Sequence, residues 1–202
     1  MKIAVLISGR GSNLQALIDA CAEPDFPAEI AMVVSNVPGA AGLERARVAG
    51  IETRTVDHHD YADRPAFEDA LLGVLDGSGA ELICLAGFMR LLTPRFIDRW
   101  HDRLINIHPS LLPKFKGLDT HARALAAGEA KTGCTIHFVR PDMDSGPIIA
   151  QAEVEVRADD TPDSLAARVL AAEHSLYPRV LRAVAEGRVH VDRDRVAVEG
   201  VI

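Results

Sequence analysis

Cysteine is scarce in this sequence, and the few cysteines form neither a recognisable pair nor a cluster. The 202 residues include three, Cys21, Cys84 and Cys134, and none of them lies in a C-x-x-C motif. An odd number of separated cysteines is typical of reduced thiols in the cytoplasm, not of a disulfide framework. We therefore expect small, buried thiols and a cytoplasmic protein.

Metal-ligand motifs are also missing. The eight histidines contain no H-E-x-x-H pattern, and no cysteines and histidines share the spacing of a zinc site. We expect no bound metal.

Long apolar runs and basic runs are absent as well. The first apolar run covers only residues 3–7, which is too short for a signal-peptide core, and no later run is long enough to span a bilayer. The formal net charge of −7, without a Lys/Arg run, argues against nucleic acid or an anionic membrane as the partner. Apolar residues make up 48% of the chain, which is usual for a globular protein, and a length of 202 residues fits one domain, so we expect a single domain over residues 1–202.

Short apolar segments alternate with amphipathic segments in the N-terminal half, which we place at residues 1–100. This alternation predicts βαβ units, and therefore a Rossmann-like α/β fold whose twisted, mainly parallel sheet has helices on both faces. The predicted strands are 2–8, 29–35, 52–56, 82–86 and 104–108, and the predicted helices are 13–21, 41–49, 65–75 and 94–99.

The pattern changes in the C-terminal half, residues 101–202. Two longer predicted strands, 133–139 and 147–156, are joined by a turn and follow a short helix at 120–127. A long amphipathic helix then begins after Thr161, which is a suitable N-cap, with Pro162 in the first helical position. The sheet is therefore expected to be extended by an antiparallel strand pair and followed by a long C-terminal helix.

A glycine-rich turn, S-G-R-G-S-N-L at 8–14, lies between the first predicted strand and the first helix. Ser12 or Asn13 can cap the helix while backbone N–H groups face outward, an arrangement that binds phosphate. The third glycine of the dinucleotide fingerprint is replaced by Leu14, and Asn36 stands where that fingerprint has an acidic residue. A simple phosphate is therefore favoured over a dinucleotide, and a tight turn without a ligand is the alternative.

The strand at 104–108 ends with two polar side chains, Asn106 and His108. Side chains alternate along a strand, so these two point the same way, and Pro109 ends the strand. The carboxyl ends of parallel strands form the ligand-binding edge of such a sheet. An amide donor beside a proton-transferring imidazole suits chemistry at a carbonyl, although a polar pair that merely closes a strand is the alternative.

Two further segments contain candidate site residues. Asp144, in D-S-G-P at 144–147, is a good turn former by itself. A carboxylate close to His108 would also favour the imidazolium, which can donate a proton. The loop G-F-M-R-L-L at 87–92 follows a strand, and its apolar residues with one arginine suit a flat, partly aromatic ligand that carries an acid. Alternatively, the apolar residues belong to the core and the arginine is a surface charge.

His137 lies in an apolar strand, so we interpret it as a core histidine.

The chain resembles the folate-dependent formyltransferases from Lys2 to Gly187. The motifs that carry the resemblance are N-I-H-P-S-L-L-P at 106–113, D-x-G-P-I-I-x-Q at 144–151, G-S-N at 11–13 and A-G-F-M-R at 86–90, with Gly117, His121, Gly133, Thr135 and His137 between them. The resemblance implies the formyltransferase fold. It also implies that a formyl group passes from 10-formyltetrahydrofolate, as co-substrate, to the amine of 5-phosphoribosylglycinamide in purine (IMP) synthesis.

The resemblance also implies the roles of individual residues, in a monomer or weak homodimer that needs no metal. Asn106, His108 and Asp144 would be catalytic, Gly11, Ser12 and Asn13 would bind the substrate phosphate, and Glu173 would bind the ribose. The folate would be bound by Arg64, Met89, Arg90, Leu91, Leu92, Asn106, Arg140 and Asp144.

Other functions remain open at this point. Another folate-dependent formyltransferase or a formyltetrahydrofolate hydrolase would share the catalytic residues. A dinucleotide-dependent oxidoreductase or a non-catalytic binding module would belong to a different class, and the departures from the dinucleotide fingerprint count against the first of these.

Overall fold

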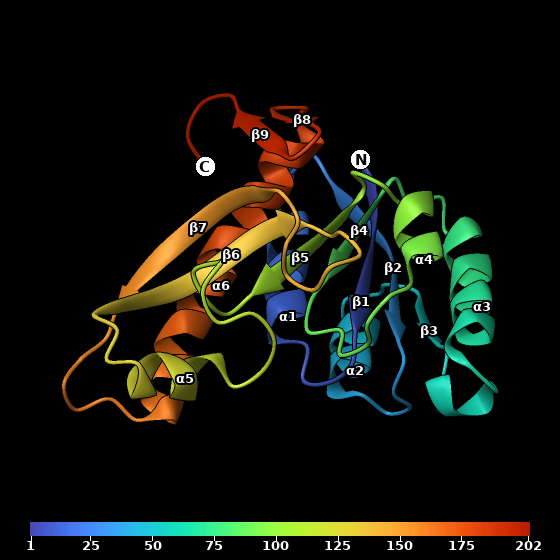
Figure 1. Cartoon of the computed structure of the whole chain (residues 1–202). Coiled ribbons are helices and arrows are strands. Elements are labelled where there is room, and N and C mark those ends of the chain that lie inside the picture. Colours follow the sequence, from blue (N-terminus) through green and yellow to red (C-terminus); the bar gives the residue numbers. More distant parts are fainter. The chain divides into compact units, whose positions relative to one another are not determined.

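The chain divides into two compact units, Met1–Ile105 and Asn106–Ile202. The computed structural model describes all residues from 1 to 202, and Figure 1 shows the elements in chain order. The hydrogen-bonded strand order is β3-β2-β1-β4-β5-β6-β7, and β8 and β9 form a separate pair. The predicted α/β fold class is confirmed, whereas the predicted single domain stays a prediction.

The first unit contains a parallel sheet built around β1 (Lys2–Ile7). Every residue of β1 after Lys2 is buried, as expected for a parallel strand covered on both faces. The other strands are β2 (Glu29–Ser35), β3 (Thr53–Thr55) and β4 (Leu82–Leu85), and the helices are α1 (Ser12–Cys21), α2 (Ala41–Val48), η1 (His58–Asp60), α3 (Arg64–Asp76) and α4 (Pro94–Arg99).

The order of strands in the first unit places helices on both faces of its sheet. The chain moves outward from β1 to β2 and β3, then returns to β4 on the other side of β1. Right-handed crossovers therefore put α1 and α2 on one face and α3 on the other. Figure 1 shows α1 and α2 together and α3 beside α4. The direction changes next to β1, so the loop that follows β1 lies at the usual ligand-binding point of such a sheet.

The second unit is organised by the antiparallel pair β6 (Lys131–Phe138) and β7 (Ile148–Glu155), against which the long helix α6 (Pro162–Ala185) packs. The predicted antiparallel extension and long C-terminal helix are confirmed. The remaining elements are β5 (Leu104–His108), whose last residues open this unit, α5 (Thr120–Ala126), and the hairpin strands β8 (Val189–Asp192) and β9 (Arg195–Val198).

Two predictions about single residues are also confirmed. Thr161 caps α6 through a reciprocal pair of bonds, in which its Oγ1 accepts from the Ser164 N–H at 3.2 Å and Ser164 Oγ accepts from the Thr161 N–H at 3.0 Å. All three cysteines are free thiols, and Cys84 and Cys134 are buried as expected, whereas Cys21 is only half-buried, at the end of α1. In none of the helices is there an apolar stretch long enough to cross a membrane.

The cap of α6 leads to a stability prediction. Replacing Thr161 by alanine removes an acceptor for a first-turn N–H, so we expect the free energy of unfolding to fall by about 1 kcal/mol. Urea denaturation at constant pH measures this difference. Thr161→Ser keeps the hydroxyl and is the control; an equal loss in both variants would contradict the capping explanation.

Candidate active site

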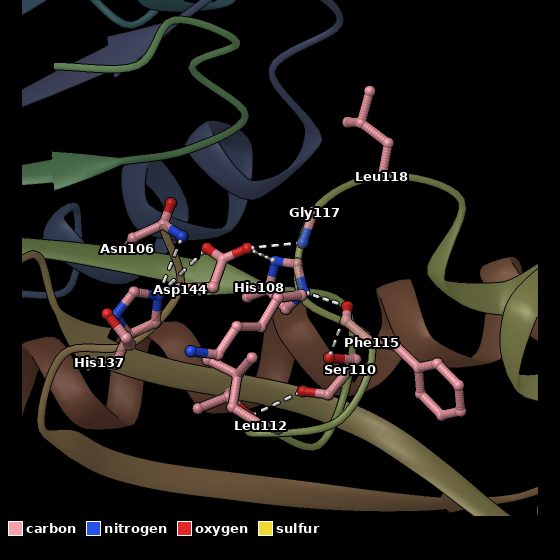
Figure 2. Close-up of polar contacts among 12 residues, drawn as sticks. Asn106, His108, Ser110, Leu112, Phe115, Gly117, Leu118, His137 and Asp144 are labelled. Carbon is pink, nitrogen blue, oxygen red and sulfur yellow. Dashed lines mark hydrogen bonds and ion pairs between the residues drawn. The ribbon is translucent and has the colours of Figure 1, made fainter. Parts of the chain in front are cut away.

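The second unit brings together the three side chains that the sequence singled out for carbonyl chemistry. Figure 2 shows Asn106 and His108 projecting from β5 toward Asp144, which lies in the turn between β6 and β7. His108 is 5% exposed, and its Nδ1 lies 3.4 Å from Oδ2 of Asp144. The carboxylate and imidazole that are 36 residues apart in the chain are therefore in direct contact.

The orientation of the His108 ring is set by a backbone carbonyl. Its Nε2 lies 2.9 Å from the carbonyl oxygen of Phe115, which can only accept, so Nε2 carries a hydrogen and donates. A neutral ring with this hydrogen would turn the lone pair of Nδ1 toward the Asp144 carboxylate. A ring with hydrogens on both nitrogens would satisfy both contacts at once, whereas a neutral ring satisfies only the contact with Phe115.

Asp144 combines the two interpretations that its sequence context allowed. Its backbone is in the left-handed region at φ 50°, which aspartate tolerates in turns, and its Oδ2 accepts the Gly117 N–H at 2.9 Å. Gly146 permits this tight turn, because a Cβ there would lie 1.7 Å from the carbonyl oxygen of Phe138. The turn thus holds the carboxylate with one oxygen toward His108.

His137 is a site residue that the sequence interpretation missed. It was expected to be a core histidine and is indeed 2% exposed, but its Nε2 lies 3.2 Å from the amide nitrogen of Asn106 and 3.8 Å from Oδ1 of Asp144. Burial lowers the pKa of His137, against the opposing effects of a bond to the Phe138 carbonyl and of the Asp144 charge. The sequence signal that could have found it is its alternation with Thr135, which puts two polar groups on one face of β6.

Thr135 supports the loop that follows His108, a role that the sequence pattern did not indicate. Its hydroxyl donates to the Ser110 carbonyl at 2.7 Å and accepts from the Leu112 N–H at 3.0 Å. The Gln151 amide on β7 donates to the Leu112 carbonyl at 2.9 Å and to the same hydroxyl at 2.8 Å. The Thr135 hydroxyl therefore donates one hydrogen bond and accepts two. These bonds attach the loop that follows His108 to both β6 and β7.

The glycine-rich turn lies in the first unit and corrects one expectation. The N-cap of α1 is Gly11, at φ 70°, and no side chain caps the helix, so the expectation that Ser12 or Asn13 would do so was wrong. A Cβ on Gly11 would lie 2.6 Å from Cα of Gly42, and the Gly42 N–H donates to the Gly9 carbonyl at 3.0 Å. This close contact with α2 shapes the turn and makes the glycine itself the cap residue.

The loop after β4 is also in the first unit and presents apolar side chains outward. Met89 is 66% exposed and Leu91 is 58% exposed, whereas Leu92 is buried. The Met89 N–H donates to Ser8 Oγ at 2.7 Å, which ties this loop to the start of the glycine-rich turn. Arg90 has a buried Nε without a protein partner, and Arg64 is exposed at the start of α3.

The two remaining candidates belong to the second unit. Arg140 is half-buried, and its Nη1 donates to the Val139 carbonyl at 3.1 Å. Glu173 is buried on α6, and its charge acts on Cys134 of β6. Burial, with this charge as the second cause, raises the pKa of the Cys134 thiol to about 12.

One group of side chains has the chemistry of metal ligands. Asp57, His58 and His59 each offer a ligand atom, and these atoms lie within 4.8 Å of one another. Hydrogen bonds account for the arrangement, because Asp57 caps η1 by accepting the His59 N–H at 3.0 Å and His58 Nδ1 donates to the Asn36 carbonyl at 3.0 Å. The group was not singled out in the sequence, where its residues are merely adjacent.

Comparisons with known proteins point to one family. The profile of the family described as "Formyl transferase" matches residues 1–181. The phosphoribosylglycinamide formyltransferase of Escherichia coli strain K12 is 45% identical over 200 residues, which is 99% of this chain and 94% of that protein. A crystal structure of glycinamide ribonucleotide transformylase 1 from Symbiobacterium toebii superimposes with a TM-score of 0.95 at 46% identity, covering 98% of this chain and 93% of that chain.

Longer relatives contain a similar segment. The trifunctional purine biosynthetic protein adenosine-3 of Bos taurus is 49% identical over 190 residues, which is 94% of this chain. The match covers 19% of that protein, so the chain corresponds to one part of it.

The buried His137 leads to a prediction about pH and stability. Its pKa is lower in the folded protein than the usual 6.5, so the unfolded chain binds more protons just below pH 6.5, and stability falls as the pH falls. In His137→Gln we expect a smaller loss of stability between pH 7 and pH 5, by up to about 1.4 kcal/mol per pH unit. Urea denaturation at several pH values measures the slope.

The control for this experiment is the exposed His101, whose replacement by glutamine is expected to leave the slope unchanged. A slope in His137→Gln equal to that of the unmodified protein would show that the pKa of His137 does not change on folding.

Proposed function

Because the chain belongs to the formyl transferase family, we propose that it transfers the formyl group of 10-formyltetrahydrofolate to the amine of 5-phosphoribosylglycinamide, in purine synthesis. The observation that carries this proposal is the 45% identity to the E. coli enzyme of that activity over 94% of its length. The geometry of the second unit supports it, because it brings an amide, an imidazole and a carboxylate together, a set suited to a carbonyl reaction.

The proposed reaction is a direct attack of the substrate amine on the formyl carbon. A C–N bond forms to the glycinamide nitrogen, and negative charge develops on the formyl oxygen of the tetrahedral intermediate. The Asn106 amide donates to this oxygen, and the His108 imidazolium, whose two N–H groups face Phe115 and Asp144, contributes its positive charge to an oxyanion hole made of side chains. The bond from the carbon to the folate nitrogen then breaks, and the folate nitrogen receives a proton in exchange for the one that the amine loses.

Asp144 has two proposed tasks in this scheme. In this scheme its contact with Nδ1 of His108 favours the charged imidazole, so a positive charge lies close to the developing oxyanion. Its carboxylate also helps to move the proton from the attacking amine to the departing folate nitrogen, through water. Because the formyl donor is already activated, the scheme requires neither a metal nor a covalent enzyme intermediate.

The substrate-binding roles are proposed from the family resemblance and are consistent with the local geometry within each unit. Gly11, Ser12 and Asn13 would bind the phosphate at the start of α1, where backbone N–H groups and the helix dipole favour an anion. Met89 and Leu91, both exposed and apolar, suit the flat rings of the folate. We further propose ribose binding by Glu173, and folate binding also by Arg64, Arg90, Leu92, Asn106, Arg140 and Asp144.

The setting that we propose follows from the same activity. Both partners are small molecules, the protein acts in the cytoplasm, and it is a monomer or a weak homodimer.

An absorbance assay tests the proposed function. The purified protein is mixed with 10-formyltetrahydrofolate, and release of the deformylated folate is followed before and after addition of phosphoribosylglycinamide. We expect release only after the amine is added. Release without the amine would identify a hydrolase, and no release in either case would contradict the proposal; a nicotinamide-cofactor titration then tests the oxidoreductase alternative.

Asp144→Asn removes the charge that faces His108 while keeping the shape of the side chain. We expect kcat to fall by about 100-fold or more, since both the proton transfer and the charged state of His108 are affected. Steady-state kinetics measure this loss, and circular dichroism checks that the variant folds. Asp142→Asn, in the same turn but exposed, is the matched control; a near-normal kcat in Asp144→Asn would remove Asp144 from the mechanism.

Asn13→Asp tests the phosphate site. A carboxylate at the start of α1 repels a phosphate dianion, so we expect KM for phosphoribosylglycinamide to rise by at least about tenfold, with little change for the folate. Asn13→Ser removes the amide without adding charge and serves as the control. If Asn13→Asp leaves KM unchanged, the phosphate binds elsewhere.

A further inference from the structure

His137 is buried beside the proposed oxyanion hole but does not belong to the catalytic set described above. In Figure 2 its ring lies next to the side chain of Asn106, with a dashed line joining the two. Any role for His137 in catalysis rests on the proposed function, because it concerns how Asn106 is prepared for the oxyanion.

The hydrogen-bond partners of His137 determine its tautomer. Nδ1 lies 2.9 Å from the carbonyl oxygen of Phe138, and a carbonyl can only accept, so Nδ1 carries the hydrogen. The ring is neutral near pH 7, because burial lowers its pKa. A neutral ring has a single N–H, so Nε2 carries a lone pair and acts as an acceptor.

That acceptor in turn determines which way the Asn106 amide faces. A carboxamide turned by 180° has almost the same shape, so packing alone does not distinguish its oxygen from its nitrogen. The lone pair of Nε2 does, because it attracts the NH₂ group at 3.2 Å and would repel the oxygen. One N–H of Asn106 is thereby used, and the second N–H remains to donate to a formyl oxygen.

The groups around His137 are consistent with a neutral acceptor. Three ionisable side chains act on it: the Asp144 carboxylate, 3.8 Å from Nε2, favours the charged ring, whereas His108 and Lys116 oppose it. On α6, which packs against β6, the Glu173 carboxylate acts on Cys134. The strand register also shifts between Ile136 and His137, a type of irregularity that re-aims a side chain near a site.

We propose that His137 is a positioning residue for formyl transfer, which accepts a hydrogen bond through Nε2 and so holds the nitrogen of the Asn106 carboxamide toward the formyl oxygen. Without this acceptor the amide turns freely, and for part of the time it presents its own oxygen to the developing oxyanion. The loss therefore falls on the chemical step and not on substrate binding.

Two substitutions separate this role from packing. His137→Leu removes the acceptor, and we expect kcat to fall by about 10- to 100-fold with both KM values unchanged. His137→Gln can place a carbonyl oxygen near the position of Nε2, and we expect it to recover most of kcat. Equal kcat in His137→Leu and the unmodified protein would overturn the proposal, as would equally low kcat in both variants when thermal unfolding shows both to be folded.

A double-mutant cycle with Asn106 tests the connection directly. If His137 acts through the Asn106 amide, His137→Leu has no further effect on kcat in an Asn106→Ala background. A purely structural role would lower kcat by the same factor in both backgrounds, and that outcome would contradict the proposal.

A spectroscopic measurement addresses the tautomer without any assay of activity. Nitrogen-15 NMR of histidine-labelled protein at pH 7 is expected to show His137, assigned by its absence in His137→Gln, with the hydrogen on Nδ1. Failure of the unmodified protein to transfer the formyl group overturns the proposed function and, with it, this role. An active protein whose His137 carries its hydrogen on Nε2 overturns the positioning role alone.

Discussion

The contact between the Asp144 carboxylate and Nδ1 of His108 is the interaction on which the proposed chemistry depends. It joins the end of β5 to the turn between β6 and β7, and it places a carboxylate against the Nδ1 atom of an imidazole that already donates through Nε2. The turn that contains Asp144 requires a glycine at position 146 and an aspartate in the left-handed region. The local backbone geometry therefore places the carboxylate beside the imidazole.

Backbone carbonyls set the hydrogen positions of both histidines in this cluster. The Phe115 carbonyl places a hydrogen on Nε2 of His108, and the Phe138 carbonyl places one on Nδ1 of His137. One ring therefore presents its Nδ1 to a carboxylate and the other presents a lone pair to an amide. The two histidines therefore present different ring nitrogens to their other neighbours, because their carbonyl partners bind different ring atoms.

Much of the fold was accessible from residue patterns, because those patterns reflect interactions between near neighbours in the chain. The alternation of apolar strands with amphipathic helices predicted the parallel sheet of the first unit, and Thr161 with Pro162 predicted the start of α6. The period-two pattern of β5 likewise placed Asn106 and His108 on one face, and the family motifs added Asp144. Those motifs also implied the binding residues, which remain proposals.

Local residue patterns did not predict the features that depend on contacts between segments far apart in the chain. The alternation of Thr135 and His137 could have suggested a polar face on β6, but nothing near His137 in the chain indicated that Asn106, 31 residues earlier, would be its partner. The cap of α1 was misassigned for the same reason, because the approach of Gly42 requires a glycine at position 11. The residues along the chain were sufficient to predict candidate groups for the chemistry, whereas their hydrogen positions and orientation depend on which carbonyls and carboxylates the folded chain places beside them.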